Sequence, residues 1–383
     1  MGKQNVKITI VHEGYKALAK EVREASHGGR VLLYAEEGLA GDDAQAALTF
    51  EGMRITRRDV PEKGSEELYA ELGKAPEGIM AVVAVGGVRP IEAAKAARIP
   101  SAIPEIYFPT ETAALSATDD RICLGTRGAL PVGCTMGHSV LLDPAILSAS
   151  PLRPGVGYLL TMMLEELDEA YEKLLLYHES PATALRTLRE KAAILSGIRE
   201  EVAPADTVNA ALTLLKVSDE SSVLGSAHTL ALLAERKVGG AFPSHLFPAA
   251  YALIRLYEAY LGALPLEHCP PPDRAENLRL LSAKCGLASS LLALGQKPYA
   301  EGYDERWRLT AEYREDFLET IKAIPLSHLA KVYRRAPKEE GAPALSASEL
   351  LMLLSLTGEA VSGYPLIKHI KMTGLIEPLL KCG

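Results

Sequence analysis

Short apolar runs alternate with amphipathic stretches over the first 143 residues of the chain. Several runs are apolar at nearly every position, which is typical of strands covered on both faces of a parallel sheet. The stretches between them have the spacing of helices with one apolar face. The pattern predicts strands at 6–11, 30–35, 53–60, 80–85, 102–108, 121–125 and 139–143, and helices at 15–25, 65–72 and 90–98. Repetition of a β-α-β unit indicates a doubly wound, Rossmann-like α/β domain with a parallel sheet.

The strand pattern stops at the segment Ser-Pro-Leu-Arg-Pro-Gly, residues 150–155, and helical spacing continues beyond it. Helices are predicted at 158–177, 182–193, 205–215, 226–236, 248–261, 274–294, 304–323, 346–356 and 365–370. The proline run at 269–273 cannot lie inside a helix and predicts a stiff connector, with Asp273 as the N-cap of the next helix. We therefore expect a nucleotide-binding α/β domain at 1–150 and an all-α domain at 151–383.

Composition narrows the class of protein. A chain of 383 residues with 48% hydrophobic residues can build two or three cores, and its net charge of −8 gives no basic surface for nucleic acid. The five cysteines have no C-x-x-C spacing, which argues against a disulfide framework or a zinc knuckle and favours a reducing compartment. No apolar run approaches the length of a signal peptide or a membrane span. These features predict a cytoplasmic protein without nucleic-acid or membrane partners.

A glycine turn joins the apolar run at 80–85 to the following helix. Gly86 and Gly87 would let the backbone approach a ligand, and Pro90 suits the first turn of a helix. The N-terminus of such a helix can receive a phosphate. Any α/β domain also needs tight turns of this kind, so the glycine pair alone does not distinguish a binding site from a connection.

The turn and its neighbours resemble a known group, the superfamily of iron-containing alcohol dehydrogenases, glycerol dehydrogenases and dehydroquinate synthases. Residues 86–95 are similar to its Gly-Gly-Gly-Ser-x-x-Asp-x-x-Lys motif, and residues 109–118 to its Pro-Thr-x-Ala loop. Val140 to Pro144, followed by Pro151, is similar to its Val-x-x-Asp-Pro crossing into the helical domain. The resemblance implies that NAD is the cofactor, with Glu36 on the ribose hydroxyls. It assigns the cofactor to Glu36, Gly86, Gly87, Arg89, Thr110 and Thr112.

Two histidines extend the resemblance into the helical region. Gly225-Ser226-Ala227-His228 is similar to the Gly-x-x-His that opens a metal-bearing helix, and His245 resembles the second histidine that starts the next helix. The resemblance implies that the two imidazoles hold Zn²⁺ or Fe²⁺, which polarises the alcohol oxygen of the substrate. We expect the two to converge, because Gly239 and Gly240 can reverse the chain between the helices.

Several positions depart from the superfamily pattern. The third metal ligand, an acid expected between Tyr158 and Thr161, is missing, and Glu165 lies roughly 10 Å further along the helix. A phenolate from Tyr158 is an uncommon ligand, and core packing is the alternative. The acids Glu165, Glu166, Asp168 and Glu169 are typical of a solvated helix face.

The glycine turn departs as well. Its third glycine is Val88, its serine is Arg89 and its aspartate is Glu92. Val88 would crowd a pyrophosphate, whereas Arg89 could either pair with a phosphate or fill its space.

Three functions follow from the resemblance. The first is NAD-dependent, metal-assisted oxidation of a small polyol or polyol phosphate, by an enzyme that would be a homo-oligomer. The alternative is a catalytically degenerate member that keeps the cleft between its domains for a ligand or partner. The third is a dehydroquinate synthase-like cyclase, which lacks support because no acid-and-lysine run occurs in the first helix of the second domain.

Overall fold

A computed structural model describes residues 7–61, 74–97, 103–118, 121–122, 132–133, 139–217, 225–263, 302–337, 345–361, 363–374 and 376. The chain forms two compact units. The N-terminal unit contains Met1–Thr126, Pro131–Gly155 and Glu201–Thr213, and the C-terminal unit contains Arg127–Leu130, Val156–Glu200 and Leu214–Gly383. The predicted helices at 65–72 and 274–294, the connector at 269–273 and all five cysteines lie outside the described residues.

The N-terminal unit is built on a six-stranded parallel sheet in the order β1-β8-β5-β4-β2-β3. Its strands are β1 (Lys7–Ile10), β2 (Arg30–Ala35), β3 (Arg54–Asp59), β4 (Ile79–Gly86), β5 (Glu105–Pro109) and β8 (Ser139–Leu142). The predicted doubly wound α/β architecture is confirmed. One predicted strand, 121–125, is wrong as a member of this sheet, because β6 (Arg121–Ile122) pairs antiparallel with β7 (Val132–Gly133) in a separate two-stranded sheet.

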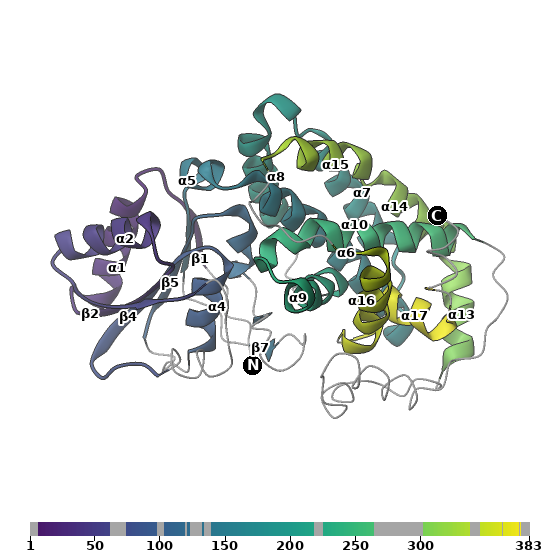
Figure 1. Ribbon diagram of the computed structural model, residues 1–383, viewed down its shortest axis with the longest axis horizontal. Coiled ribbons are helices and arrows are strands. Elements are labelled where there is room, and N and C mark those ends of the chain that lie inside the picture. The colour runs from purple at the N-terminus through teal and green to yellow at the C-terminus, as the bar shows by residue number, and fades with distance from the viewer. Residues whose placement is uncertain are drawn as a thin grey trace. The chain divides into compact units, whose positions relative to one another are not determined.

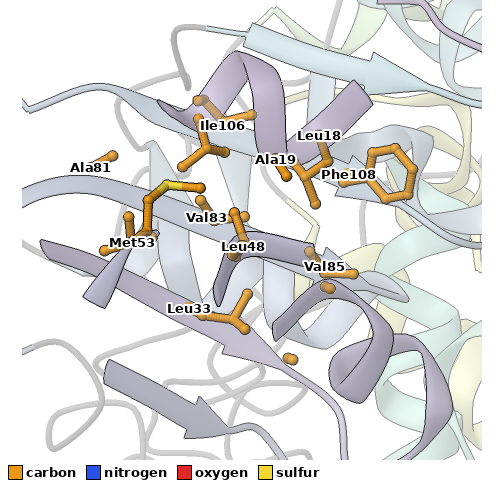
Figure 2. Packing of buried hydrophobic residues seen from close by; sticks show 14 of the residues in the cluster. Leu18, Ala19, Leu33, Leu48, Met53, Ala81, Val83, Val85, Ile106 and Phe108 are labelled. Atoms are coloured by element: carbon orange, nitrogen blue, oxygen red, sulfur yellow. The ribbon is translucent and has the colours of Figure 1, made fainter. Parts of the chain in front are cut away.

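Helices α1 (Tyr15–Ser26) and α2 (Leu39–Phe50) cover one face of the sheet. Figure 2 shows Leu18 of α1 and Leu48 of α2 packed over Leu33 of β2 and Val83 of β4. Helix α2 is absent from the sequence prediction. Its first turns hold Gly41 and two aspartates, which favour turns, and only a few small or apolar positions mark its buried face.

Helix α4 (Val88–Ala96) packs against β4, β2 and β5, on the side of the sheet away from α1 and α2 (Figure 1). Its residues from Val88 to Lys95 are all buried, charged ones included. A 3-10 helix, η1 (Thr112–Thr118), follows β5 and contacts α4, and α5 (Pro144–Ala149) follows β8. Asp143 caps α5 by accepting the backbone N–H groups of Ala145 and Ile146.

The C-terminal unit is largely helical, as predicted. Its described helices are α6 (Leu152–Tyr177), α7 (Ala182–Ser196), α9 (Ser226–Val238), α10 (Phe242–Gly262), α13 (Tyr303–Glu312), α14 (Arg314–Ala323), α15 (Leu326–Arg335), α16 (Ala347–Ala360) and α17 (Leu366–Thr373). The first four residues of α6 belong to the N-terminal unit, as does most of the 3-10 helix η2 (Glu200–Val202) and of α8 (Ala203–Val217). Helix α10 begins six residues before the predicted start and carries Pro248 in its interior. None of the helices in the described ranges combines the length and the apolar character that crossing a bilayer requires.

Candidate functional site

The predicted phosphate turn lies at the carboxyl end of β4 in the N-terminal unit. Gly86 ends the strand with φ of 135°, a backbone conformation that a residue with a side chain rarely adopts. Gly87 is the N-cap of α4 in an extended conformation, so it does not need to be glycine for its φ. Glycine is needed at position 87 because neighbouring side chains leave no room for a Cβ atom.

Two carboxylates fill the space beside Gly87. Glu36 follows β2 and Glu111 follows β5, the strands on either side of β4, and parallel strands bring their carboxyl ends to one edge. A Cβ atom on Gly87 would lie 2.5 Å from Oε1 of Glu111 and 3.0 Å from Oε1 of Glu36. The Val88 N–H donates to the Glu111 carboxylate at 3.2 Å. Sequence reasoning found Glu36 and missed Glu111, which lies between the two threonines that it singled out.

The other cofactor candidates lie close to this edge. The backbone N–H of Thr110 donates to the Gly86 carbonyl at 2.9 Å, which sets the loop after β5 beside the turn. Thr112 is buried at the start of η1. Arg89 is also buried, and its Nη1 lies 3.3 Å from Oε2 of Glu92, one turn along the same helix.

A dinucleotide does not fit this arrangement of side chains. Its pyrophosphate needs the first N–H groups of the helix and a cation or open backbone beside them. Here the Val88 N–H has a carboxylate acceptor, and the Arg89 guanidinium is paired with a second carboxylate.

Helix α9 in the C-terminal unit begins with the Gly-x-x-His segment, as predicted. His228 lies in its first turn, and its Nδ1 contacts the carboxylate of Glu165 on α6. The same carboxylate accepts the Gly225 N–H at 3.0 Å. A Cβ atom on Gly225 would lie 2.9 Å from Cγ of Glu165, so the glycine is what allows α6 to approach. Because a carboxylate only accepts, Nδ1 is the protonated nitrogen in this contact.

A buried aspartate holds the same helix start from one turn further along α6. Asp168 accepts the Ser226 hydroxyl at 2.5 Å, the Tyr257 hydroxyl at 2.9 Å and the Leu366 N–H at 3.3 Å. Burial raises the pKa of Asp168 to about 7, against the opposing effect of these hydrogen bonds. The prediction that Glu165 and Asp168 lie on a solvated face is therefore wrong.

His245 lies in the first turn of α10, where the sequence places it. Gly239 and Gly240 have φ of 80° and 84°, and they form the predicted turn between α9 and α10. The His245 Nε2–H donates to the Gly239 carbonyl at 2.7 Å. The rings of His228 and Phe242 stack with centroids 5.8 Å apart, so the start of α10 also fixes the orientation of His228.

The third ligand position carries no acid. Tyr158 and Thr161 are buried in α6, and the Thr161 hydroxyl has no hydrogen-bond partner among the described residues. Within the described part of the chain, no three His, Cys, Asp or Glu side chains are grouped so that they could hold a metal ion. Two imidazoles alone do not fit a metal that needs three protein ligands.

The whole chain was compared with known proteins. Glycerol dehydrogenase from Schizosaccharomyces pombe superimposes with a TM-score of 0.54 at 16% identity, covering 90% of this chain and 97% of that one. Iron-containing alcohol dehydrogenase from Thermococcus thioreducens has a TM-score of 0.57 at 18% identity and covers 100% of both chains. The iron-containing alcohol dehydrogenase from Thermotoga maritima has a TM-score of 0.55 at 15% identity, covering 100% of this chain and 99% of that one.

This chain has the fold of the iron-containing alcohol and glycerol dehydrogenases. The resemblance seen in the sequence is confirmed at the level of the fold, over the whole length of the chain. No protein-family model and no curated protein sequence matches it. At these sequence identities, the shared fold does not establish an activity or a substrate for this chain.

Proposed function

We propose that this chain is a catalytically degenerate member of the alcohol dehydrogenase fold, which binds a small ligand or a partner and does not oxidise alcohols. The observation that carries the proposal is the third ligand position on α6, where a buried phenol and a buried hydroxyl replace an acid. A divalent ion held by two neutral imidazoles lacks the anionic ligand that would bind it tightly.

The glycine turn supports the same proposal independently. Its helix N–H and its arginine both have carboxylate partners from the chain itself. A pyrophosphate would have to displace one carboxylate and lie beside another. The proposal therefore expects weak metal binding and weak NAD binding in the same protein.

A second candidate is the NAD-dependent, metal-assisted oxidation of a polyol or polyol phosphate by a homo-oligomer. The contact between His228 and Glu165 favours it, because metal-ligating histidines usually donate their other ring nitrogen to a carboxylate. Both histidines also start the helices on which the resemblance places them.

Elemental analysis and an NAD titration of the same purified protein decide between the two. The protein would be incubated with Zn²⁺ or Fe²⁺, dialysed, analysed for bound metal, and titrated with NAD by calorimetry. We expect less than one tenth of an equivalent of metal and no saturable heat. One equivalent of metal together with NADH formation from glycerol or glycerol phosphate would establish the dehydrogenase and refute the proposal.

A further inference from the structure

We propose that the Glu111 carboxylate is a built-in substitute for a ligand phosphate, and that it makes the α4 turn select against phosphorylated nucleotides. The first N–H groups of a helix have no partner within the helix and attract an anion. Gly87 has no side chain that could cap α4, and the Glu111 carboxylate accepts the Val88 N–H at 3.2 Å instead. The anion that the helix attracts therefore comes from the chain itself.

The position of Glu111 also removes the space that a phosphate would occupy. A glycine at the N-cap opens room for an atom beside the backbone, and here that room is taken by the Glu111 carboxylate, 2.5 Å from the position of a Cβ atom. Oε1 of Glu36 lies 3.0 Å from the same position. A phosphate would meet two partly buried carboxylates within a few ångströms, and like charges at that distance repel.

The nearest cation of α4 does not offset this repulsion. The Arg89 guanidinium is 7% exposed and is paired with Glu92, which is 6% exposed. To reach a phosphate, the Arg89 guanidinium would have to give up this buried ion pair, which is costly. The selectivity against phosphate therefore depends on Glu111, with Glu36 adding to the charge.

Replacement of Glu111 by serine tests the inference with two probes, ADP and adenosine, which differ only in the phosphates. We expect no saturable ADP binding to the native protein by calorimetry. Glu111→Ser should bind ADP at least tenfold more tightly, with no comparable gain for adenosine. Glu111→Gln removes the charge and keeps the size of the side chain, so it should give a smaller gain in ADP affinity. It also tests the inference if the serine variant does not fold.

The exposed neighbour of Glu36 provides the control. Glu37 also carries a negative charge near the end of β2, but its side chain is exposed, and Glu37→Gln should leave ADP binding unchanged. The inference is overturned if the native protein binds ADP as tightly as both Glu111 variants, or if adenosine gains as much as ADP. The comparison of ADP and adenosine between native and variant proteins depends on neither metal nor turnover, whereas metal content and NADH formation test the proposed function, so the two failures can be told apart.

Discussion

At the scale of single residues, the orientation of His228 depends on one carboxylate 63 positions earlier in the chain. Glu165 accepts both the Gly225 N–H and the His228 Nδ1–H, and the stacked ring of Phe242 limits rotation of the imidazole. The result is an imidazole that is held through its Nδ1–H in one orientation.

Glu165→Gln is expected to weaken the preference of His228 for the form protonated on Nδ1. An amide can turn its NH₂ group toward the ring, and a neutral acceptor holds the Nδ1–H less strongly than a carboxylate does. Long-range ¹H–¹⁵N NMR spectra should show the Nδ1–H form of His228 in the native protein and a mixture of tautomers in the variant. Glu169→Gln breaks a pair with Lys173 on the same helix and should leave the spectrum unchanged. An unchanged tautomer in both variants would contradict the role of Glu165.

His369 gives the stability of the protein a pH dependence of known sign. It is fully buried in α17 among aromatic rings, and burial, followed by the charge of Arg306, lowers its pKa to about 3. The unfolded chain takes up a proton near the ordinary pKa of about 6.5, whereas the folded chain does not. Stability from this residue is therefore present above about pH 6.5 and is lost as the pH falls toward 3.

His369→Leu removes the titrating group and fills its place with an apolar side chain of similar size. Relative to the native protein, the variant should gain up to about 1.4 kcal/mol of unfolding free energy for each pH unit below 6. Urea unfolding at pH 7.5, 6 and 5 measures the difference. His12→Leu, at an exposed position, should show a much smaller change with pH. A constant difference between native and His369→Leu proteins would contradict the prediction.

Residues that stand in a recognisable local segment can be singled out from the sequence, whereas residues whose contacts come from distant parts of the chain cannot. His228, His245 and the glycine turn are found because each lies at the start of a helix in a recognisable segment. Glu165 and Asp168 look like surface acids in a helix, and nothing local shows that the start of α9 packs onto them. Glu111 is missed for the same reason.

At the scale of secondary structure, the first half of α6 is the position of the missing third metal ligand. An acid introduced there tests whether the two histidines are the remainder of a metal site. Tyr158→Asp would add an anionic oxygen to two imidazoles, and three protein ligands with one open position is the usual arrangement of catalytic zinc. If His228 and His245 are former ligands, Zn²⁺ affinity measured by competition with a chelator should rise at least a hundredfold. The loss of the buried ring costs about 3 kcal/mol of stability or more.

Tyr158→Asn makes the same cavity without the charge and is the matched control for that measurement. It should bind Zn²⁺ no better than the native protein. Thr161→Glu is a second way to supply the acid, at a buried hydroxyl that has no partner among the described residues. If neither acidic variant binds Zn²⁺ more tightly when folded, the assignment of the two histidines as former ligands is wrong.

The bounds of several strands agree with the prediction from periodicity, whereas the bounds of the helices at 242–262 and 303–323 do not. Strands β2, β4, β5 and β8 are predicted within a few residues because most of their positions are apolar. Helix α10 is predicted to begin at Pro248, since proline favours the first turn, but Pro243 occupies that position and Pro248 is tolerated inside the helix. The predicted helix at 304–323 is two helices, α13 and α14, which meet at Tyr313.

At the scale of the whole molecule, length and composition predict two or three cores, but they do not predict which residues join the elements within each unit. In the C-terminal unit, Asp168 joins elements that are up to 198 residues apart in the sequence. It accepts hydrogen bonds from the start of α9, from Tyr257 of α10 and from the start of α17. Two helix N-termini thus share one buried carboxylate, which their dipoles stabilise.

Asp168→Ala should therefore destabilise the C-terminal unit as a whole. It removes the acceptor of the Ser226 hydroxyl and of the Leu366 N–H and leaves the Tyr257 O–H only the 3.2 Å hydrogen bond that it donates to Ser226, which is expected to cost about 3 kcal/mol or more. Asp168→Asn keeps one oxygen acceptor and the shape of the side chain, so its cost should be about half as large. Hydrogen exchange read by mass spectrometry should show faster exchange in α9 and α17 and unchanged exchange in β2 and β4 of the N-terminal unit. Asp316→Ala, at an exposed position in α14, should change neither. Faster exchange confined to α6, with α9 and α17 still protected, would mean that Asp168 is a local contact and not the residue that joins these helices.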